Sequence, residues 1–72
     1  MKTQDFVLRG EYIELDSLLK LLGIAPSGGT AKLMVADGLV SVDGTVESRK
    51  TRKLRAGQVV SVGGQSIRVV GA

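Results

Sequence analysis

The residues with the clearest chemical capability form one basic run, SRKTRKLRAG, at residues 48–57. It holds five cations within seven residues and no carboxylate among them: Arg49, Lys50, Arg52, Lys53 and Arg55. Like charges packed this closely repel one another, and a phosphate backbone would remove that repulsion. The run therefore predicts a phosphate-binding surface, and the competing interpretation is an ordinary solvated loop.

The arrangement of these cations depends on the path that the chain takes through the run. An extended strand would divide them between two faces, with Lys50 and Arg52 beside Leu54, and with Arg49, Lys53 and Arg55 beside Thr51. Leu54 is expected to anchor the segment to the core. A curved or looped path would let more of the cations contact one ligand.

A second candidate anion site is the sequence SGG at residues 27–29, at the expected start of a helix. Gly28 and Gly29 would let a ligand approach the backbone closely, and the unpaired N–H groups at a helix start attract anions. Lys32 follows about one turn later and would supply a counter-charge. The competing interpretation is a flexible loop in which Ser27 simply caps the helix.

The distribution of charge agrees with a polyanionic partner. Residues 1–44 contain four Lys or Arg and six Asp or Glu, whereas residues 45–72 contain six Lys or Arg and one Glu. The net charge of +3 is therefore unevenly distributed, and residues 45–72 are strongly basic. A local excess of cations is the electrostatic pattern expected of a protein that binds a polyanion.

The residue types give little support to catalysis or metal binding. The chain has no Cys and no His, which excludes thiolate zinc sites, cysteine nucleophiles and histidine bases. Among its seven carboxylates, Glu14 and Asp16 suit a helix start and Asp43 suits a turn. We therefore expect no enzyme, no catalytic residue, no metal and no cofactor.

The length of the chain indicates one domain, over residues 1–72, and nothing in the sequence demands a dimer. No stretch approaches the ~20 apolar residues that span a bilayer. The first residues also lack the apolar centre of a signal peptide. The sequence thus predicts a cytoplasmic monomer with no membrane partner.

Two helices are predicted in the first half of the chain. Apolar residues recur with helical spacing over residues 15–22, and Gly23 is placed to end that helix. Pro26 rules out one continuous helix, so a second is expected over residues 28–36, with Gly38 as its stop. Only a few residues connect the two helices, so they should pack as neighbours.

The remaining apolar stretches predict short strands: 6–8 at a sheet edge, 39–42 with its return at 45–47, and a hairpin of 59–62 and 66–70 that follows a turn at 56–57. Asp43-Gly44 is a strong signal for a type I′ turn, whose two central residues need positive φ. Together these elements predict an α+β fold, in which two packed N-terminal helices are followed by a small, mostly antiparallel β-sheet.

The stretch SGGTAKLMVADGLVSVDG at residues 27–44 resembles the RNA-binding domain of the ribosomal protein S-four type. The pattern of that family opens on Leu-Asp, continues through a Ser-capped second helix and runs into Gly-x-Val-x-Val-Asn-Gly. This chain matches at Leu15-Asp16 and then, with the right spacing, at Ser27, Ala31, Val35, Gly38, Val40, Val42 and Gly44. Gly-Gly before the second helix is similar to a small one-domain bacterial form, the YbcJ group. The family-like core covers about residues 14–62.

Several residues depart from the family pattern, among them Leu33 at a position that is commonly polar. Gly28 stands where the family has an Arg that often contacts RNA, Asp43 replaces an Asn, and Gln58 replaces an Asp. The amides of Gly28 and Gly29, with Lys32, are expected to take the place of the missing Arg.

The resemblance implies an alpha-L-type RNA-binding motif that binds structured RNA of the ribosomal or transfer class. The expected RNA-binding residues are Ser27, Gly28, Gly29, Lys32, Arg49, Lys50, Arg52, Lys53 and Arg55. Phe6 and Tyr12 are the only aromatic residues; we expect Phe6 in the core and Tyr12 partly buried, and the alternative for Tyr12 is a lone stacking residue. So few stacking rings favour recognition of RNA through its backbone and shape.

Two other functions compete with RNA binding. A DNA-binding accessory protein would use the same cations, because phosphate contacts do not separate the two nucleic acids. A protein-interaction adaptor would use the apolar second helix, on which Leu33 is the residue expected to stay exposed. A ubiquitin-like carrier is not expected, because Gly63-Gly64 is internal and the sequence ends in Gly71-Ala72.

Overall fold

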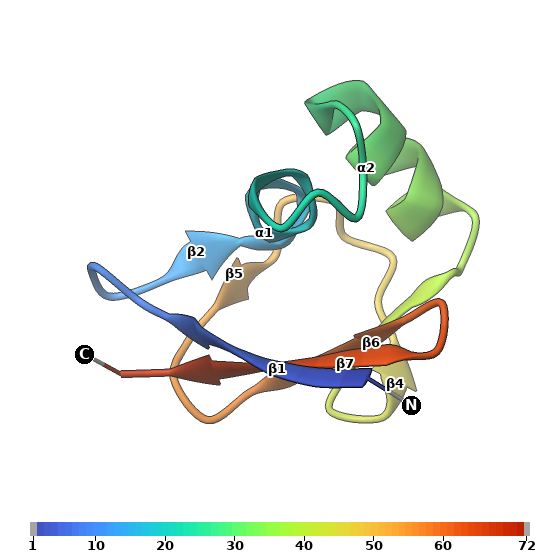
Figure 1. The fold of residues 1–72 in the computed structure, drawn as a ribbon. Coiled ribbons are helices and arrows are strands. Elements are labelled where there is room, and N and C mark those ends of the chain that lie inside the picture. Colours follow the sequence, from blue (N-terminus) through green and yellow to red (C-terminus); the bar gives the residue numbers. More distant parts are fainter. Residues whose placement is uncertain (1, 72) are drawn as a thin grey trace.

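The computed structural model describes residues 2–71 and contains seven strands and two helices (Figure 1). In chain order they are β1 (Lys2–Val7), β2 (Ile13–Glu14), α1 (Leu15–Leu21), α2 (Gly28–Ala36), β3 (Val40–Val42), β4 (Thr45–Val46), β5 (Lys53–Leu54), β6 (Val59–Val62) and β7 (Gln65–Val70). In the described part of the chain, neither helix is long and apolar enough to cross a membrane.

The strands form one five-stranded sheet, in the order β1-β7-β6-β3-β4, and a separate ribbon of β2 and β5. Both helices lie on the same side of the large sheet, as Figure 1 shows. Leu15, Leu18 and Leu19 of α1 are fully buried, as are Val60 and Ile67 of the sheet. The core therefore fills the space between the helices and the sheet, as expected for an α+β fold.

The predicted α+β class is confirmed, but the position of the helices in the chain differs from the prediction. They are not N-terminal, because β1 and β2 precede them. β1 pairs in parallel with β7 at the sheet edge, and Arg68 donates two hydrogen bonds of 3.1 Å to Asp5 across this pair. Most of β1 is polar and exposed, so only its apolar end, near Phe6, was visible in the sequence pattern.

The second helix has the predicted bounds and the predicted cap. Ser27 has extended backbone, and its Oγ accepts a hydrogen bond of 3.2 Å from the Thr30 N–H. Ala31 and Val35 are buried against the core. α1 ends, as predicted, just before Gly23, which has a φ of 73°. Both helices are therefore set by short-range signals in the sequence.

The turn between β3 and β4 has the predicted positive φ at both central residues, 51° at Asp43 and 84° at Gly44. The Asp43 carboxylate also accepts a hydrogen bond of 2.9 Å from the Val59 N–H and one of 3.4 Å from the Gln58 side chain. Two of the residues that depart from the family pattern are thus in contact, and together they join the hairpin to β6.

We expect Asp43→Ala to lower the free energy of unfolding by about 1.5–3 kcal/mol. Alanine tolerates positive φ less well than Asp or Asn, and it leaves the Val59 N–H without its acceptor. Asp43→Asn keeps both properties and should cost less than about 1 kcal/mol. Urea unfolding of the two variants measures the difference, and equal losses would show that the hydrogen bond to β6 contributes nothing.

Candidate nucleic-acid interface

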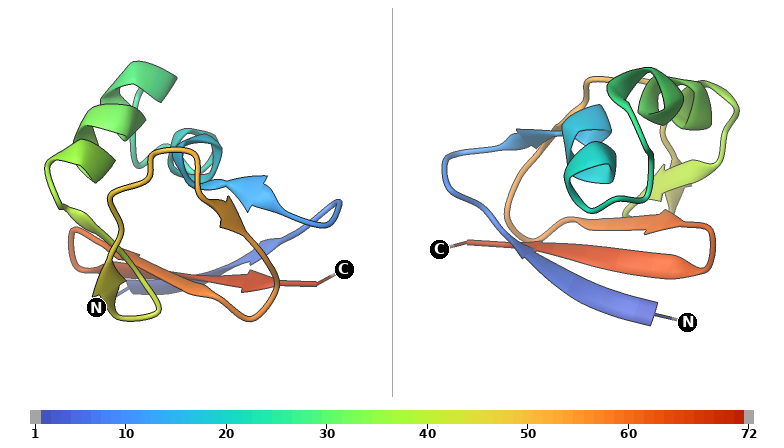
Figure 2. Two further views of the ribbon diagram at one scale, coloured as in Figure 1. Left: turned by 180° about the vertical axis from the view of Figure 1, so that it is seen from behind. Right: turned by 45° about the horizontal axis from the view of Figure 1, so that its top comes forward.

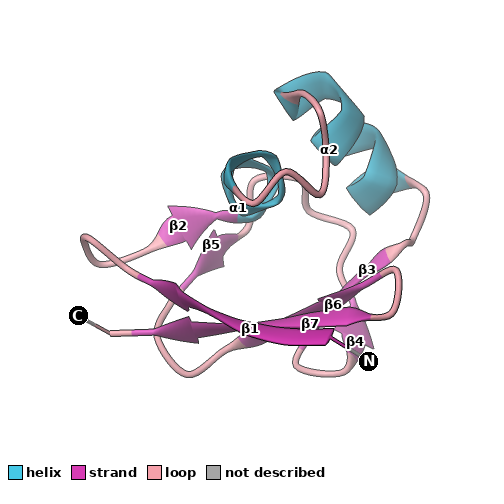
Figure 3. Cartoon of the chain, in the orientation of Figure 1, coloured by secondary structure: helices cyan, strands magenta, loops and turns pink. Residues whose placement is uncertain are grey.

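The basic segment, defined as residues 48–55, is a loop that ends in the short strand β5 (Figure 3). β5 pairs with β2 in antiparallel register, with Ile13 opposite Leu54 and Glu14 opposite Lys53. Leu54 is fully buried, as predicted, and Lys53 is exposed. The ribbon therefore turns one face to the core and carries Lys53 on the other.

The backbone of the basic segment is attached to the start of α1. The Leu15 N–H donates to the Arg52 carbonyl at 2.9 Å, and the Asp16 N–H donates to the Lys50 carbonyl at 3.2 Å. These bonds satisfy N–H groups at a helix start that has no side-chain cap. The left view of Figure 2 shows the segment, in yellow and orange, rising from the sheet to pass beside α1.

Glu47 accepts the hydrogen bonds that hold the basic segment in its shape. Its side chain is only 7% exposed and accepts from the Arg49 N–H at 2.9 Å, from Arg49 Nε at 3.2 Å and from an Arg52 guanidinium nitrogen at 2.6 Å. The hydrogen bonds from Arg52, and then those from Arg49, lower the pKa of Glu47 to about 2. Glu47 is therefore an ionised, buried carboxylate that offsets part of the repulsion within the run.

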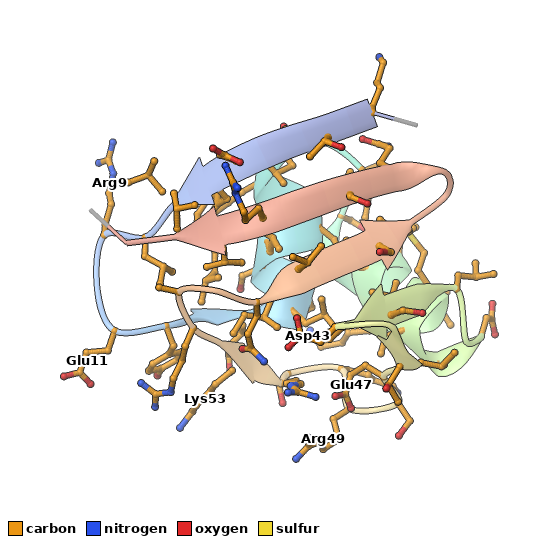
Figure 4. All side chains as sticks on the ribbon, turned by 90° about the horizontal axis from the view of Figure 1, so that it is seen from below. Arg9, Glu11, Asp43, Glu47, Arg49 and Lys53 are labelled. Carbon is orange, nitrogen blue, oxygen red and sulfur yellow. The ribbon has the colours of Figure 1, made fainter. Side chains whose placement is uncertain are left out.

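The five cations consequently have different surroundings. Arg52 is 29% exposed and lies against Glu47, whereas the Arg49 side chain is 72% exposed despite its ion pair. Lys50, Lys53 and Arg55 are exposed. In Figure 4, Arg49 and Lys53 extend from the same side of the molecule. The turn at residues 50–51 breaks the two-faced arrangement of an extended strand, and the path is the looped one.

Tyr12 lies beside the end of the basic segment. Lys53 Nζ is 5.0 Å from the centre of its ring, and the Arg55 guanidinium carbon is 5.9 Å from it. Arg55 also donates a hydrogen bond of 3.4 Å to the Glu11 carbonyl. Tyr12 is 43% exposed, so this aromatic residue is open to solvent next to charged groups.

The start of α2 is joined to the same region through Asp16. Lys32 Nζ forms a 2.9 Å ion pair with the Asp16 carboxylate, and the backbone of Asp16 contacts the basic segment. Ser27 caps its own helix, and Gly29 is exposed while Gly28 is partly buried. Lys32 is therefore held toward α1, and an anion on the Gly28 and Gly29 amides stays a prediction.

Sequence reasoning missed the part that Asp16 and Glu47 play in shaping this surface, and it did not predict the contact of Tyr12 with the basic segment. Glu47 carried a usable signal, since it is the one carboxylate of residues 45–72 and stands just before the basic run. Asp16 and Tyr12 contact the run only through pairings between distant parts of the chain. Among residues 2–71, no group of three carboxylates gathers in a way that could hold a metal ion.

Comparison with known sequences identifies close relatives. YbcJ of Escherichia coli (strain K12), named "Putative RNA-binding protein YbcJ", is 52% identical over 59 residues, which are 82% of this chain and 84% of that protein. A protein of Bacillus subtilis (strain 168), named "Probable ribosome maturation protein RlbA", is 39% identical over 54 residues, which are 75% of this chain and 76% of that protein.

A solved structure agrees with these matches. The solution structure of Escherichia coli YbcJ, whose title describes an alpha-L motif involved in RNA binding, superimposes with a TM-score of 0.67 at 47% identity. It covers 97% of this chain and 87% of the YbcJ chain. The sequence profile of the S4 domain matches residues 6–70, which extends the resemblance beyond the expected core of residues 14–62. The chain is therefore a member of the S4 domain family.

Proposed function

We propose that this protein is a non-catalytic RNA-binding module, which binds structured RNA through a basic surface that contacts phosphates. The observation that carries this proposal is the basic segment itself. Its backbone is hydrogen-bonded to α1, the buried and ionised Glu47 just before it accepts from Arg49 and Arg52, and Lys50, Lys53 and Arg55 are exposed. A preformed set of cations loses less conformational freedom when it binds than a flexible tail would.

The proposed surface has two parts. In the first, the exposed cations Lys50, Lys53 and Arg55 bind phosphates together with Arg49, while Arg52 holds the segment in shape through Glu47. The second part consists of the start of α2, with Ser27, Gly28, Gly29 and Lys32. The ion pair between Lys32 and Asp16 joins the two parts.

The names of two relatives support one class of RNA as the partner. One is named for RNA binding and another for ribosome maturation, and these names favour ribosomal RNA, with transfer RNA as the nearest alternative. The scarcity of aromatic residues favours an RNA recognised mainly by backbone and shape. We further propose that the protein is a monomer formed by one domain over residues 1–72. Its proposed location is the cytoplasm.

Fluorescence polarisation tests this function. A folded RNA hairpin, a matched DNA hairpin and a single-stranded RNA are each titrated with the protein over a series of salt concentrations. We expect a preference for folded RNA, with a slope of log K against log salt of roughly −3.5 to −4.5 if about five phosphates are engaged. Equal and weak binding to all three would contradict the proposal, and a preference for the DNA hairpin would favour the accessory DNA-binding function.

A protein partner is the second candidate, because large apolar side chains of α2 and of the chain that follows it stay exposed. Leu33 of α2 is 63% exposed, Leu39 is 56% exposed and Val46 is 60% exposed. We expect Leu33→Asp to leave RNA affinity within about twofold and the fold intact, because Leu33 lies outside the core. If Leu33→Asp weakens RNA binding by tenfold or more, this face belongs to the RNA surface and not to a protein contact.

A further inference from the structure

An open apolar groove borders the basic segment, and Tyr12 both lines the groove and contacts the segment. The groove has a volume of about 860 Å3 and lies between the end of β1, the following loop and the end of α1. Its apolar lining is supplied mainly by Phe6, Val7, Leu8, Tyr12, Leu21 and Leu22. A volume of this size is within the range of small-molecule sites, and it is ample for one aromatic heterocycle.

The Tyr12 ring has an unusual combination of neighbours. It contributes to the apolar groove, yet Lys53 and Arg55 lie 5.0 and 5.9 Å from its centre. Lys53 belongs to β5, which pairs with the chain just after Tyr12, where Ile13 is opposite Leu54, and Arg55 directly follows β5. A ring placed in this way can stack with a planar group in the groove and hold two cations at its border.

The charges around the groove favour an occupant that carries a phosphate. Arg9 lines the groove and is exposed, and Lys53 and Arg55 lie next to it through Tyr12. Asp5, the one carboxylate among the described residues that line the groove, is already paired with Arg68. Figure 4 shows Glu11 between Arg9 and Lys53 along the outline of the molecule, and its exposed carboxylate opposes an anion there.

We propose that the groove binds one unpaired nucleobase of the RNA, stacked on Tyr12, while Lys53 and Arg55 bind the phosphate next to that base. The inference rests on the proposed RNA-binding function and deepens it. The base would pack against the apolar walls and stack on the exposed ring, and its attached phosphate would pair with the two cations. One aromatic ring can stack with only one base. The proposed partner is therefore an otherwise paired RNA with one bulged or looped-out nucleotide.

Tyr12 reports directly on this contact, because it is the one Tyr of a chain without Trp. Three RNA hairpins serve as probes: one fully paired, one with a single bulged nucleotide, and one with an abasic residue at the bulge. Stacking should quench the tyrosine fluorescence with the bulged hairpin and leave it nearly unchanged with the abasic one. Equal quenching by all three hairpins would overturn the inference.

Affinities of three proteins complete the test. Tyr12→Ala should weaken binding of the bulged hairpin by roughly 5- to 150-fold, the range that stacking of one base produces. Tyr12→Phe keeps the ring and should retain affinity to within about threefold. Neither change should alter the salt slope, because no phosphate contact is removed. For the abasic hairpin, Tyr12→Ala should have almost no effect.

The outcomes separate the inference from the function on which it rests. If the wild-type protein binds the hairpins with a steep salt slope but Tyr12→Ala binds as tightly, the groove does not hold a base and the RNA-binding function stands. If the wild-type protein binds no RNA, both fail. If Tyr12→Phe loses as much affinity as Tyr12→Ala while its urea unfolding is unchanged, the hydroxyl group and not the stacking ring is responsible, and the inference is wrong.

Discussion

Glu47→Ala is expected to lower the free energy of unfolding by about 2–3 kcal/mol, a large fraction of the stability of a small domain. The variant leaves the Arg49 N–H and the Arg52 guanidinium without the carboxylate that accepts from both. For a domain of this size, the melting temperature should fall by roughly 10–20 °C. Calorimetry at pH 7 measures the change. A loss below about 0.5 kcal/mol would mean that the buried carboxylate does not hold the basic segment.

The same residue predicts a pH dependence whose sign follows from its pKa. Folding lowers the pKa of Glu47 from 4.5 to about 2, so its contribution to stability is complete above about pH 5 and is lost as the pH falls toward 2. Glu47→Gln removes the titrating group but keeps the shape of the side chain. The wild-type protein should therefore lose stability more steeply than Glu47→Gln between pH 5 and pH 2. Parallel curves would contradict the assignment.

The double variant Lys50→Ala/Lys53→Ala should weaken binding of a folded RNA hairpin by roughly 10- to 30-fold at about 0.1 M salt and flatten the salt slope by about 1.4–1.8. Both lysines are exposed and neither forms an ion pair within residues 2–71, so the fold should be unaffected. Arg52 is unsuitable for this test, because its removal would leave the Glu47 carboxylate without a partner.

A matched control removes the same charge elsewhere. Lys2 lies in β1, and Lys20 is an exposed residue of the last turn of α1, at the opposite end of that helix from its contacts with the basic segment. Lys2→Ala/Lys20→Ala should change affinity by less than about threefold. If the two double variants weaken binding equally, net charge alone attracts the RNA and the basic segment has no special role.

Local signals in the sequence account for most of the secondary structure. The Ser27 cap, the leucine spacing of α1 and the Asp43-Gly44 turn each act over a few residues, and each is present in the structure. The pairings of β1 with β7 and of β2 with β5 could not be predicted in this way. β1 has no alternation of apolar residues, and β2 and β5 have two residues each.

The candidate site was predictable as a list of cations but not as an arrangement. The run of basic residues is evident from the sequence alone. Leu54, the apolar residue within it, is buried in the core as predicted. Arg52 pairs with Glu47, whereas Lys53 contacts Tyr12. Which cation makes which contact depends on where the chain turns. That turn is set by hydrogen bonds to α1, which lies more than thirty residues earlier in the sequence.

The parallel pairing of β1 with β7 also determines when the sheet can be completed during synthesis of the chain. The partners Lys2 and Gln65 are separated by almost the whole chain, so β1 leaves the ribosome long before its neighbour exists. The helices, the β3–β4 hairpin and β6 can form earlier, but the sheet edge closes only after synthesis of β7. Closure of so long a loop is slow compared with helix formation. We therefore expect a nascent chain arrested before residue 65 to leave β1 accessible to a protease that the full chain resists.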